Sequence, residues 1–257
     1  MSILFTLCGR AGSKGFPNKN TKSFLGIPLL YYSLAAIQLF MERQSGQCCI
    51  DVALNTDSTV LAEISQKQNR ILVHLLTREP DLAGDRVAKV AVIKDSLDKM
   101  EHLAQKNYEM VVDLDLTSPI RTAENIEEAV LRKRKRADVD VVFSVTDARR
   151  NPYFNMVKRE NEYFCRALKS SYTSRQQAPP YYDMNASIYV YSTKALKNKS
   201  EADFYNDKCD AILMKDTGIL DIDSEEDFEL LQVIAEYLIG TDSGFGDVYT
   251  KAKEYIK

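Results

Sequence analysis

The chain has 257 residues, of which 45% are hydrophobic, so it is long enough to bury the core of one sizeable domain. Its 34 Lys and Arg residues against 37 Asp and Glu residues give a net charge of −3. This balance lacks the basic excess that non-specific binding to DNA or RNA uses, so we expect no nucleic-acid partner.

No apolar run approaches the roughly 20 residues that cross a bilayer, and Gly9 and Arg10 interrupt the first apolar run too early for a signal peptide. We therefore expect a cytoplasmic protein without a membrane partner.

Short apolar or β-branched runs alternate with longer helical patterns through the first 145 residues. The predicted strands cover residues 3–8, 50–55, 71–76, 110–116 and 139–145, and the predicted helices cover residues 29–42, 59–69, 87–105 and 123–136. This alternation is typical of β-α-β units that build a mainly parallel sheet. The sequence therefore predicts an α/β fold.

The alternation stops after Val145. Residues 151–191 are rich in aromatic and turn-forming residues, which predicts a hairpin or arm inserted into the sheet domain. Residues 218–223 are predicted as a short strand, and residues 225–239 as a helix that Ser224 and Asp227 cap. The tail after residue 239 is a candidate for one more helix.

A glycine-rich, cationic loop directly follows the first predicted strand. It reads Gly9-Arg10-Ala11-Gly12-Ser13-Lys14-Gly15-Phe16-Pro17-Asn18-Lys19-Asn20. Glycines allow backbone N–H groups to approach an anion closely, and the Arg and Lys side chains supply positive charge for a polyphosphate. The spacing matches neither the P-loop of NTPases nor the glycine pattern of dinucleotide-binding folds. The alternative is a basic surface turn without a ligand.

Two groups of polar residues lie further along the chain. Asp221 and Asp223 flank Ile222 at a predicted strand end, where alternate side chains face the same side. Two such carboxylates suit a Mg²⁺ or Mn²⁺ ion that bridges to phosphate oxygens, although Asp and Ser also gather at helix starts as caps. Asp115, Thr117 and Ser118 follow another predicted strand and are candidate substrate contacts, with ordinary helix entry as the alternative.

The ordered motifs resemble the CMP-sialic acid synthetase family, also called acylneuraminate cytidylyltransferases. The family's opening motif A-R-x-x-S-K-G-[ILV]-x-x-K-N matches residues 9–20 except that Gly9 replaces the first Ala and Phe16 the aliphatic residue. Further matching segments occur in family order: Asn55-Thr56-Asp57-Ser58, Thr117-Ser118-Pro119-Ile120-Arg121, Arg175-Gln176-Gln177, Asn185-Ala186-Ser187-Ile188-Tyr189 and Asp221-Ile222-Asp223. Together they span about residues 3 to 232, nearly the whole chain.

The resemblance implies a Rossmann-like nucleotidyltransferase fold with a mixed, mainly parallel sheet. The cytidylyltransferase domain would cover residues 1–240, with an inserted dimerisation arm at 148–182 and a tail at 241–257, and the protein would form a homodimer. Its substrates would be CTP and a nonulosonic acid, and its cofactor Mg²⁺ or Mn²⁺ bound by Asp221 and Asp223. With these two carboxylates, Arg10 and Lys14 would be the catalytic residues.

The resemblance also implies which residues contact each substrate. The nucleotide side would be formed by Gly9, Arg10, Ala11, Gly12, Ser13, Lys14, Lys19, Asn20, Arg78 and Lys89. The sugar side would be formed by Asp115, Thr117, Ser118, Phe154, Arg175, Gln176, Asp183, Asn185 and Tyr189, with Arg175 reaching the cleft of the partner subunit.

The departures from the family pattern fall on the sugar side. Enzymes for N-acetylneuraminic acid usually carry Gln, Lys and Arg where this chain has Asp115, Phe154 and Asp183. The strings around these residues look like the legionaminic acid branch, so legionaminic acid is the expected acceptor. The alternatives are N-acetylneuraminic acid, pseudaminic acid or 3-deoxy-manno-octulosonate as acceptor, or a non-catalytic nucleotide-binding relative.

Overall fold

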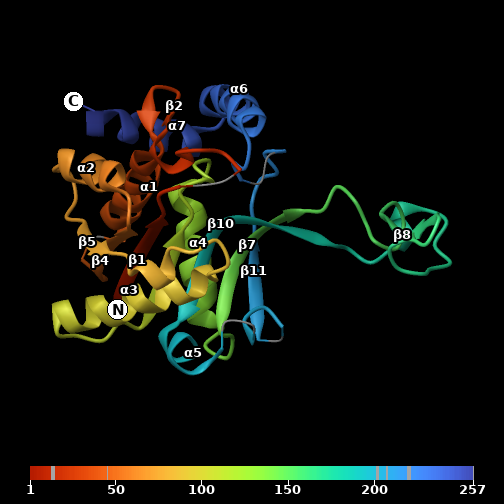
Figure 1. Cartoon of the computed structure of the whole chain (residues 1–257), viewed down its shortest axis with the longest axis horizontal. Coiled ribbons are helices and arrows are strands. Elements are labelled where there is room, and N and C mark those ends of the chain that lie inside the picture. The colour runs from red at the N-terminus through yellow and green to blue at the C-terminus, as the bar shows by residue number, and fades with distance from the viewer. Residues whose placement is uncertain (13–14, 45, 201–202, 207, 219–220, 257) are drawn as a thin grey trace.

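The computed structural model describes residues 1–12, 15–44, 46–200, 203–206, 208–218 and 221–256. Its centre is a seven-stranded sheet in the order β11-β7-β10-β6-β1-β4-β5 (Figure 1). The strands are β1 Ser2–Gly9, β4 Cys49–Thr56, β5 His74–Thr77, β6 Met110–Leu114, β7 Val141–Asp147, β10 Tyr182–Ser192 and β11 Cys209–Leu213. β10 runs antiparallel to its neighbours β6 and β7, and the other neighbouring strands are parallel. The predicted mixed, mainly parallel sheet is confirmed.

Helices cover both faces of the sheet because the strands carry apolar residues on both sides. Ile3, Phe5 and Leu7 of β1 belong to a core with α1 Leu29–Gln44, α4 Ala123–Lys135 and α7 Ser243–Lys253. Leu4 points into the opposite core, with α3 Lys89–Ala104 and α5 Thr193–Asn198. This alternation along β1 follows from the period of two in a strand.

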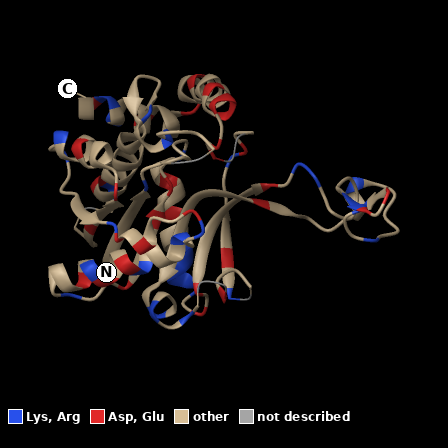
Figure 2. Ribbon diagram, viewed as in Figure 1, with Lys and Arg blue, Asp and Glu red and all other residues tan. Residues whose placement is uncertain are grey.

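Two further helices complete the body. α2 Thr59–Lys67 begins at Ser58, whose hydroxyl accepts a hydrogen bond from the amide of Leu61. α6 Glu225–Thr241 begins at Ser224, which forms the expected capping box with Asp227. Three acidic residues in the first turn of α6 face the positive end of the helix dipole, visible as red ribbon in Figure 2. The small hairpin of β2 Ser23–Phe24 and β3 Ile27–Pro28 leads from the glycine-rich loop into α1.

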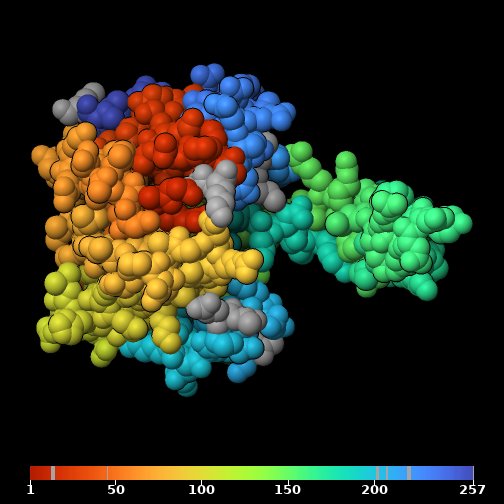
Figure 3. Space-filling model, in the orientation of Figure 1, coloured from red at the N-terminus to blue at the C-terminus, as the bar shows by residue number. Residues whose placement is uncertain are grey.

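Residues 148–181, which we call the arm, leave the sheet between β7 and β10 and extend away from the body (Figures 1 and 3). Near its far end, β8 Val157–Glu160 and β9 Tyr163–Arg166 pair as an antiparallel hairpin. The short turn between them begins with Asn161, whose φ of 57° is of the kind that tight hairpin turns require. The long β10 returns the chain from the arm to the centre of the sheet.

Some predicted elements differ from the structure. The predicted strand at 218–223 is wrong: Gly218 and residues 221–223 are irregular, and residues 219 and 220 lie outside the described part. The segment is held by a backbone hydrogen bond of 3.0 Å, from the amide of Ile222 to the carbonyl of Thr117, in place of a ladder of strand hydrogen bonds.

Two elements of the structure, β11 and α5, were not predicted from the sequence. The tail after residue 242 forms α7 and a 3-10 turn, packed on α1 and α6. Within the described residues, no helix is long and apolar enough to span a bilayer.

Candidate active site

A cavity of about 500 Å³ lies beyond the carboxyl ends of the central strands. In open α/β sheets this edge is where ligands bind, because loops after parallel strands meet there. Nine of the residues predicted from the sequence line it: Arg10, Lys19, Asn20, Arg78, Lys89, Asp115, Thr117, Asp221 and Asp223. The cavity thus brings the cationic loop and the acidic segment to one place, although 204 positions separate Lys19 from Asp223 in the sequence.

The loop after β1 is held by hydrogen bonds that fix its backbone. The amide of Ala11 donates to Oδ1 of Asp57 at 2.8 Å, and Nδ2 of Asn20 donates to the carbonyl of Arg10 at 3.1 Å. A Cβ on Gly9 would clash with Cδ2 of Leu61, so that buried side chain would have to move to admit a larger residue. Asp57 lies in the motif Asn55-Thr56-Asp57-Ser58 but has no assigned role in the sequence-based prediction, and in the structure it helps to anchor the loop. Ser13 and Lys14 lie outside the described residues.

Gly12 is also constrained, with a φ of 69° that side chains rarely adopt. Arg10 points from this loop to Asp85, with 2.5 Å between its Nη1 and the carboxylate Oδ1. Asp85 belongs to the segment after β5, which also lines the cavity, and sequence reasoning missed it. The ion pair therefore links the two loops that border the cavity.

Arg78 is a buried cation at the end of β5. Its Nε donates to Oδ1 of Asn55 and its Nη2 to the carbonyl of Asn55, both at 3.0 Å. Nδ2 of Asn55 in turn donates to the hydroxyl of Ser96 at 3.0 Å. A buried guanidinium fixed in this way has a set direction, which suits recognition of a polar ligand group.

The acidic segment lies directly against the cationic loop. Nζ of Lys19 is 2.8 Å from Oδ1 of Asp223 and donates to the carbonyl of Ile222 at 2.9 Å. Gly15 approaches so closely that a Cβ on it would be 3.1 Å from the carbonyl oxygen of Asp223. Ile222 is fully buried, as predicted, while both aspartates line the cavity. Burial raises the pKa of Asp221, and the negative charges of Asp223 and Asp115 add to this rise.

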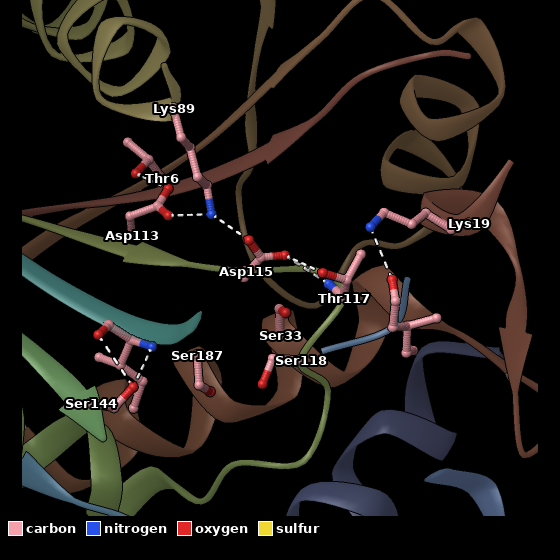
Figure 4. A network of polar contacts seen from close by, with 12 residues as sticks. Thr6, Lys19, Ser33, Lys89, Asp113, Asp115, Thr117, Ser118, Ser144 and Ser187 are labelled. Carbon is pink, nitrogen blue, oxygen red and sulfur yellow. Dashed lines mark hydrogen bonds and ion pairs between the residues drawn. The ribbon is translucent and has the colours of Figure 1, made fainter. Parts of the chain in front are cut away.

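Lys89 and Asp115 form the floor of the cavity, and Lys89 links Asp115 to the buried carboxylate of Asp113 (Figure 4). Its Nζ lies 2.7 Å from Oδ2 of Asp113 and 2.7 Å from Oδ2 of Asp115. Burial acts to raise the pKa of Asp115, but the charge of Lys89 and the hydrogen bonds from Lys89 and Thr117 outweigh it and hold that pKa well below its usual range. Asp113 is fully buried, and it has no role in the sequence-based prediction.

Arg121 is a fully buried hub behind this floor. Its Nε donates to the hydroxyl of Ser187 at 3.0 Å and its Nη1 to the hydroxyl of Ser33 at 2.8 Å, while Nη2 contacts the carbonyls of Asp115 and Ser118. Burial lowers the pKa of Arg121 to about 10, so the side chain stays charged at neutral pH. The role of this arginine is to fix the turn that carries Asp115 and Ser118.

Three residues predicted for the sugar side lie on or near the strands beside the cavity. Ser118 and Asn185 line a separate, small pocket, and the carboxamide oxygen of Asn185 accepts a hydrogen bond from Ser144 at 2.5 Å. Tyr189 lies on β10 with its ring centre 6.0 Å from Nζ of Lys89. Tyr189 thus lies near Lys89, and Ser118 directly follows Thr117, so both are next to residues that line the cavity.

The remaining predicted residues lie outside the lining of the cavity. Phe154, Arg175 and Gln176 belong to the arm, and Arg175 donates to the carbonyl of Ala148 at 3.0 Å. Asp183 pairs with Thr146 between β10 and β7. Within the single chain, these arm residues are therefore separate from the cavity.

The carboxylates of Asp221 and Asp223 would bind a divalent metal only together with oxygen atoms from a bound phosphate and water. Among the described residues, no group of three His, Cys, Asp or Glu side chains could hold a metal ion. Mg²⁺ is commonly bound by one or two carboxylates together with substrate phosphates and water, so Asp221 and Asp223 match that type of site.

Comparison with known proteins places most of the chain in one family. The family described as cytidylyltransferase matches residues 7–239. The chain is 32% identical to a CMP-N,N'-diacetyllegionaminic acid synthase of Campylobacter jejuni, over 90% of this chain and 94% of that protein. It is 29% identical to a protein of the same name from Legionella pneumophila, over 92% and 97%. An N-acylneuraminate cytidylyltransferase of Streptococcus agalactiae is also 29% identical, over 89% of this chain and 52% of that longer protein.

Solved structures share the fold at low sequence identity. A CMP:2-keto-3-deoxy-manno-octonic acid synthetase in complex with CTP superposes with a TM-score of 0.62 at 14% identity, over 92% of this chain and 99% of that one. A 4-diphosphocytidyl-2C-methyl-D-erythritol synthase of Anaerococcus prevotii superposes with a TM-score of 0.60 at 12% identity, over 91% and 96%. Since the family matches most of the chain, this protein belongs to the cytidylyltransferase family.

Proposed function

We propose that this protein transfers the cytidylyl group of CTP to a nine-carbon, sialic-acid-like sugar acid, releasing pyrophosphate. The observation that carries the proposal is the cavity in which the glycine-rich cationic loop meets Asp221 and Asp223. A triphosphate needs cations and free backbone amides, and a metal that chelates it needs carboxylate oxygens. Arg10 and Lys19 of the loop and the carboxylates of Asp221 and Asp223 line one cavity of about 500 Å³.

The reaction we propose is attack of the anomeric hydroxyl of the sugar on the α-phosphorus of CTP. The P–O bond to pyrophosphate breaks as the new P–O bond to the sugar forms, and the hydroxyl proton leaves to solvent. Arg10 and Lys14 would offset the charge of the departing pyrophosphate, and Lys19 and Asn20 would hold the phosphates on the loop side. Arg78, fixed by Asn55, would contact the nucleotide from the opposite loop. The task of these residues is positioning and charge neutralisation.

Asp221 and Asp223 would hold Mg²⁺ or Mn²⁺. When bound, the metal would supply a Lewis acid that offsets phosphate charge and lowers the pKa of the attacking hydroxyl. Until CTP and metal arrive, Lys19 pairs with Asp223, so the acidic segment is partly neutralised by the chain's own lysine.

We propose legionaminic acid as the acceptor. The support is that two relatives named CMP-N,N'-diacetyllegionaminic acid synthase match over 94% and 97% of their own length, and that Asp115, Phe154 and Asp183 depart from the pattern for N-acetylneuraminic acid. Pseudaminic acid is the rival acceptor, since a pseudaminic acid cytidylyltransferase of Campylobacter jejuni is 25% identical over 95% of this chain.

We further propose a homodimer that forms through the arm, in the cytoplasm where CTP is available. Val157, Tyr163 and Phe164 on the arm hairpin are between 62% and 76% exposed. Exposed apolar residues gathered at the end of a projecting hairpin are typical of a subunit interface.

The test is pyrophosphate release by the purified protein with CTP, Mg²⁺ and one acceptor at a time. We expect release with N,N'-diacetyllegionaminic acid at a kcat/KM at least about tenfold above that with pseudaminic, N-acetylneuraminic or 3-deoxy-manno-octulosonic acid. A higher kcat/KM with one of these three sugar acids would identify it as the acceptor and leave the proposed reaction unchanged. No release with any acceptor, by a protein that binds CTP, would favour a non-catalytic nucleotide-binding relative.

A further inference from the structure

The lysine at the start of α3 occupies an unusual electrostatic setting. Nζ of Lys89 contacts Asp113 and Asp115 at 2.7 Å each, so two of its three N–H donors are directed at carboxylates. The three side chains together carry a net negative charge if all are ionised. Burial acts to lower the pKa of Lys89, but the charges of Asp113 and Asp115 outweigh it and raise that pKa well above its usual value. A phosphate near this ammonium would meet two carboxylates beside it.

Asp113 is the fixed end of the cluster. It lies on β6, directly beside Thr6 of β1 in the sheet register, and is fully buried. The hydroxyl of Thr6 donates to Oδ1 of Asp113 at 2.8 Å, which leaves Oδ2 for Lys89. A buried carboxylate costs folding free energy unless it is paired, so Asp113 and Lys89 are held together. Asp113 does not line the cavity.

Asp115 is the exposed end of the cluster. The amide and hydroxyl of Thr117 donate to its Oδ1 at 2.9 and 2.7 Å, and Lys89 holds its Oδ2 (Figure 4). A carboxylate has about four acceptor positions, so these hydrogen bonds leave one for a ligand. The side chain is 22% exposed and lines the cavity. Asp115 is therefore an acceptor that three hydrogen bonds hold in place at the cavity wall.

We propose that Lys89, anchored by Asp113 and Thr6, is a positioning residue that holds Asp115 as an ionised acceptor for an O–H or N–H group of the sugar acid. Lys89 then binds no phosphate of the nucleotide. This inference rests on the proposed function and assigns the cavity floor to the sugar. The cation contacts to phosphate come from the loop after β1.

The test compares Lys89→Met, Asp115→Asn and the double variant with the wild type. Each single variant should raise the KM for the sugar about tenfold or more, because a hydrogen bond to a charged acceptor is lost or misdirected. The double variant should match Asp115→Asn alone, since Lys89 acts through Asp115. The dissociation constant for CTP, measured by calorimetry, should stay within about twofold in all three variants.

A matched control exists on the same helix. Nζ of Lys99 also lies 3.0 Å from two carboxylates, those of Glu79 and Asp95, but Lys99 does not line the cavity. Lys99→Met should leave both the KM for the sugar and the affinity for CTP unchanged. Comparison of Lys99→Met with Lys89→Met therefore shows whether the rise in KM comes from the loss of any such ion-pair cluster or from the misplacement of Asp115.

Three results would overturn the inference. They are an affinity for CTP about tenfold weaker in Lys89→Met, additive effects in the double variant, or an unchanged KM for the sugar in Asp115→Asn. The last variant keeps the side-chain shape and decides the question even if Lys89→Met does not fold. A wild type inactive with every sugar would instead refute the proposed function, and calorimetry with CTP would still decide the role of Lys89.

Discussion

Single side chains in the cavity are held by neighbours of opposite charge. Arg10 pairs with Asp85, Lys19 with Asp223, and Lys89 with Asp113 and Asp115. Asp221 differs, because burial and two nearby carboxylates disfavour its ionised form. An unfavourable charge of this kind is common at functional sites, where ligand binding takes precedence over stability.

Replacing Asp221 with Asn should reduce kcat by roughly a hundredfold or more, because one of the two proposed metal ligands is lost. The same variant should have a higher Tm than the wild type at about pH 7.5 in EDTA. A carboxyl group with a raised pKa in the folded state costs stability above that pKa, and the cost is absent below its ordinary value. The gain in Tm should therefore shrink as the pH falls from the raised pKa of Asp221 in the folded state toward the ordinary pKa of an aspartate.

Thermal unfolding between about pH 3 and pH 8, with parallel turnover assays, checks both effects. Asp98→Asn is the control, because Asp98 is exposed on α3 and does not line the cavity. Full turnover in Asp221→Asn would remove this residue from the catalytic site. A lower Tm than the wild type near neutral pH would contradict the electrostatic cost assigned to Asp221.

Much of the site at the level of residues could be predicted from motifs. Arg10, Lys19 and Asp223 follow from glycine, cation and carboxylate patterns that have a direct chemical meaning. The motif that contains Asp57 does not say which loop its carboxylate contacts, and Asp85 belongs to no motif, so the partner of each depends on which loop it faces. Such pairings are set by the packing of the loops and leave no local pattern.

Among the elements, the site depends on contact between the loop after β1 and the irregular segment at residues 221–223. Alternation of Asp and Ile predicts a strand there, yet the structure has a backbone hydrogen bond to Thr117 in its place. Ile222 would be buried in a strand and is also buried in the irregular segment, so hydrophobic alternation alone could not distinguish these two structures. β11 was not predicted because its five residues begin with Cys and Asp, which leaves only a short apolar run in the sequence.

Gly15→Ala should test the close approach of these two elements. A Cβ on Gly15 would stand 3.1 Å from the carbonyl oxygen of Asp223, so the segments must move apart by a few tenths of an ångström. We expect kcat/KM for CTP to fall about tenfold, since small misplacements of reacting groups are costly, with Tm nearly unchanged. Steady-state kinetics would measure this fall.

Gly240→Ala serves as the comparison for Gly15→Ala, because a Cβ at position 240 meets no atom within 4 Å. It lies in α6, where alanine favours the helix, so activity should persist and stability should rise slightly. Equal activity of the two variants would show that the contact between loop and acidic segment is not needed.

On the scale of the complete chain, the arm projects from the body (Figure 3). Its apolar side chains Val157, Tyr163 and Phe164 are exposed. Aromatic and turn-forming residues predict an inserted arm, but its direction depends on where β7 and β10 enter the sheet. The residues on it that the resemblance links to the sugar do not reach the cavity of their own chain. A homodimer would resolve this by placing them at the cavity of the partner.

If the proposed homodimer forms through the arm, replacing Tyr163 and Phe164 with Ser should abolish it. Both side chains are more than 70% exposed in the single chain, at 76% and 72%, and burying them at an interface would supply much of its apolar area. Light scattering after size exclusion should give twice the chain mass of 29.2 kDa for the wild type and 29.2 kDa for the double variant. A dimeric double variant, or a monomeric wild type, would contradict this role of the arm.

Calorimetric titration of CTP, with and without Mg²⁺, into the wild type and the Asp221→Asn/Asp223→Asn variant decides whether the cationic loop and the acidic segment enclose one metal-bound triphosphate. For the wild type we predict one CTP per chain and an affinity that rises at least about tenfold with Mg²⁺. For the variant we predict binding that Mg²⁺ no longer strengthens. The same gain from Mg²⁺ in both proteins would contradict the shared site.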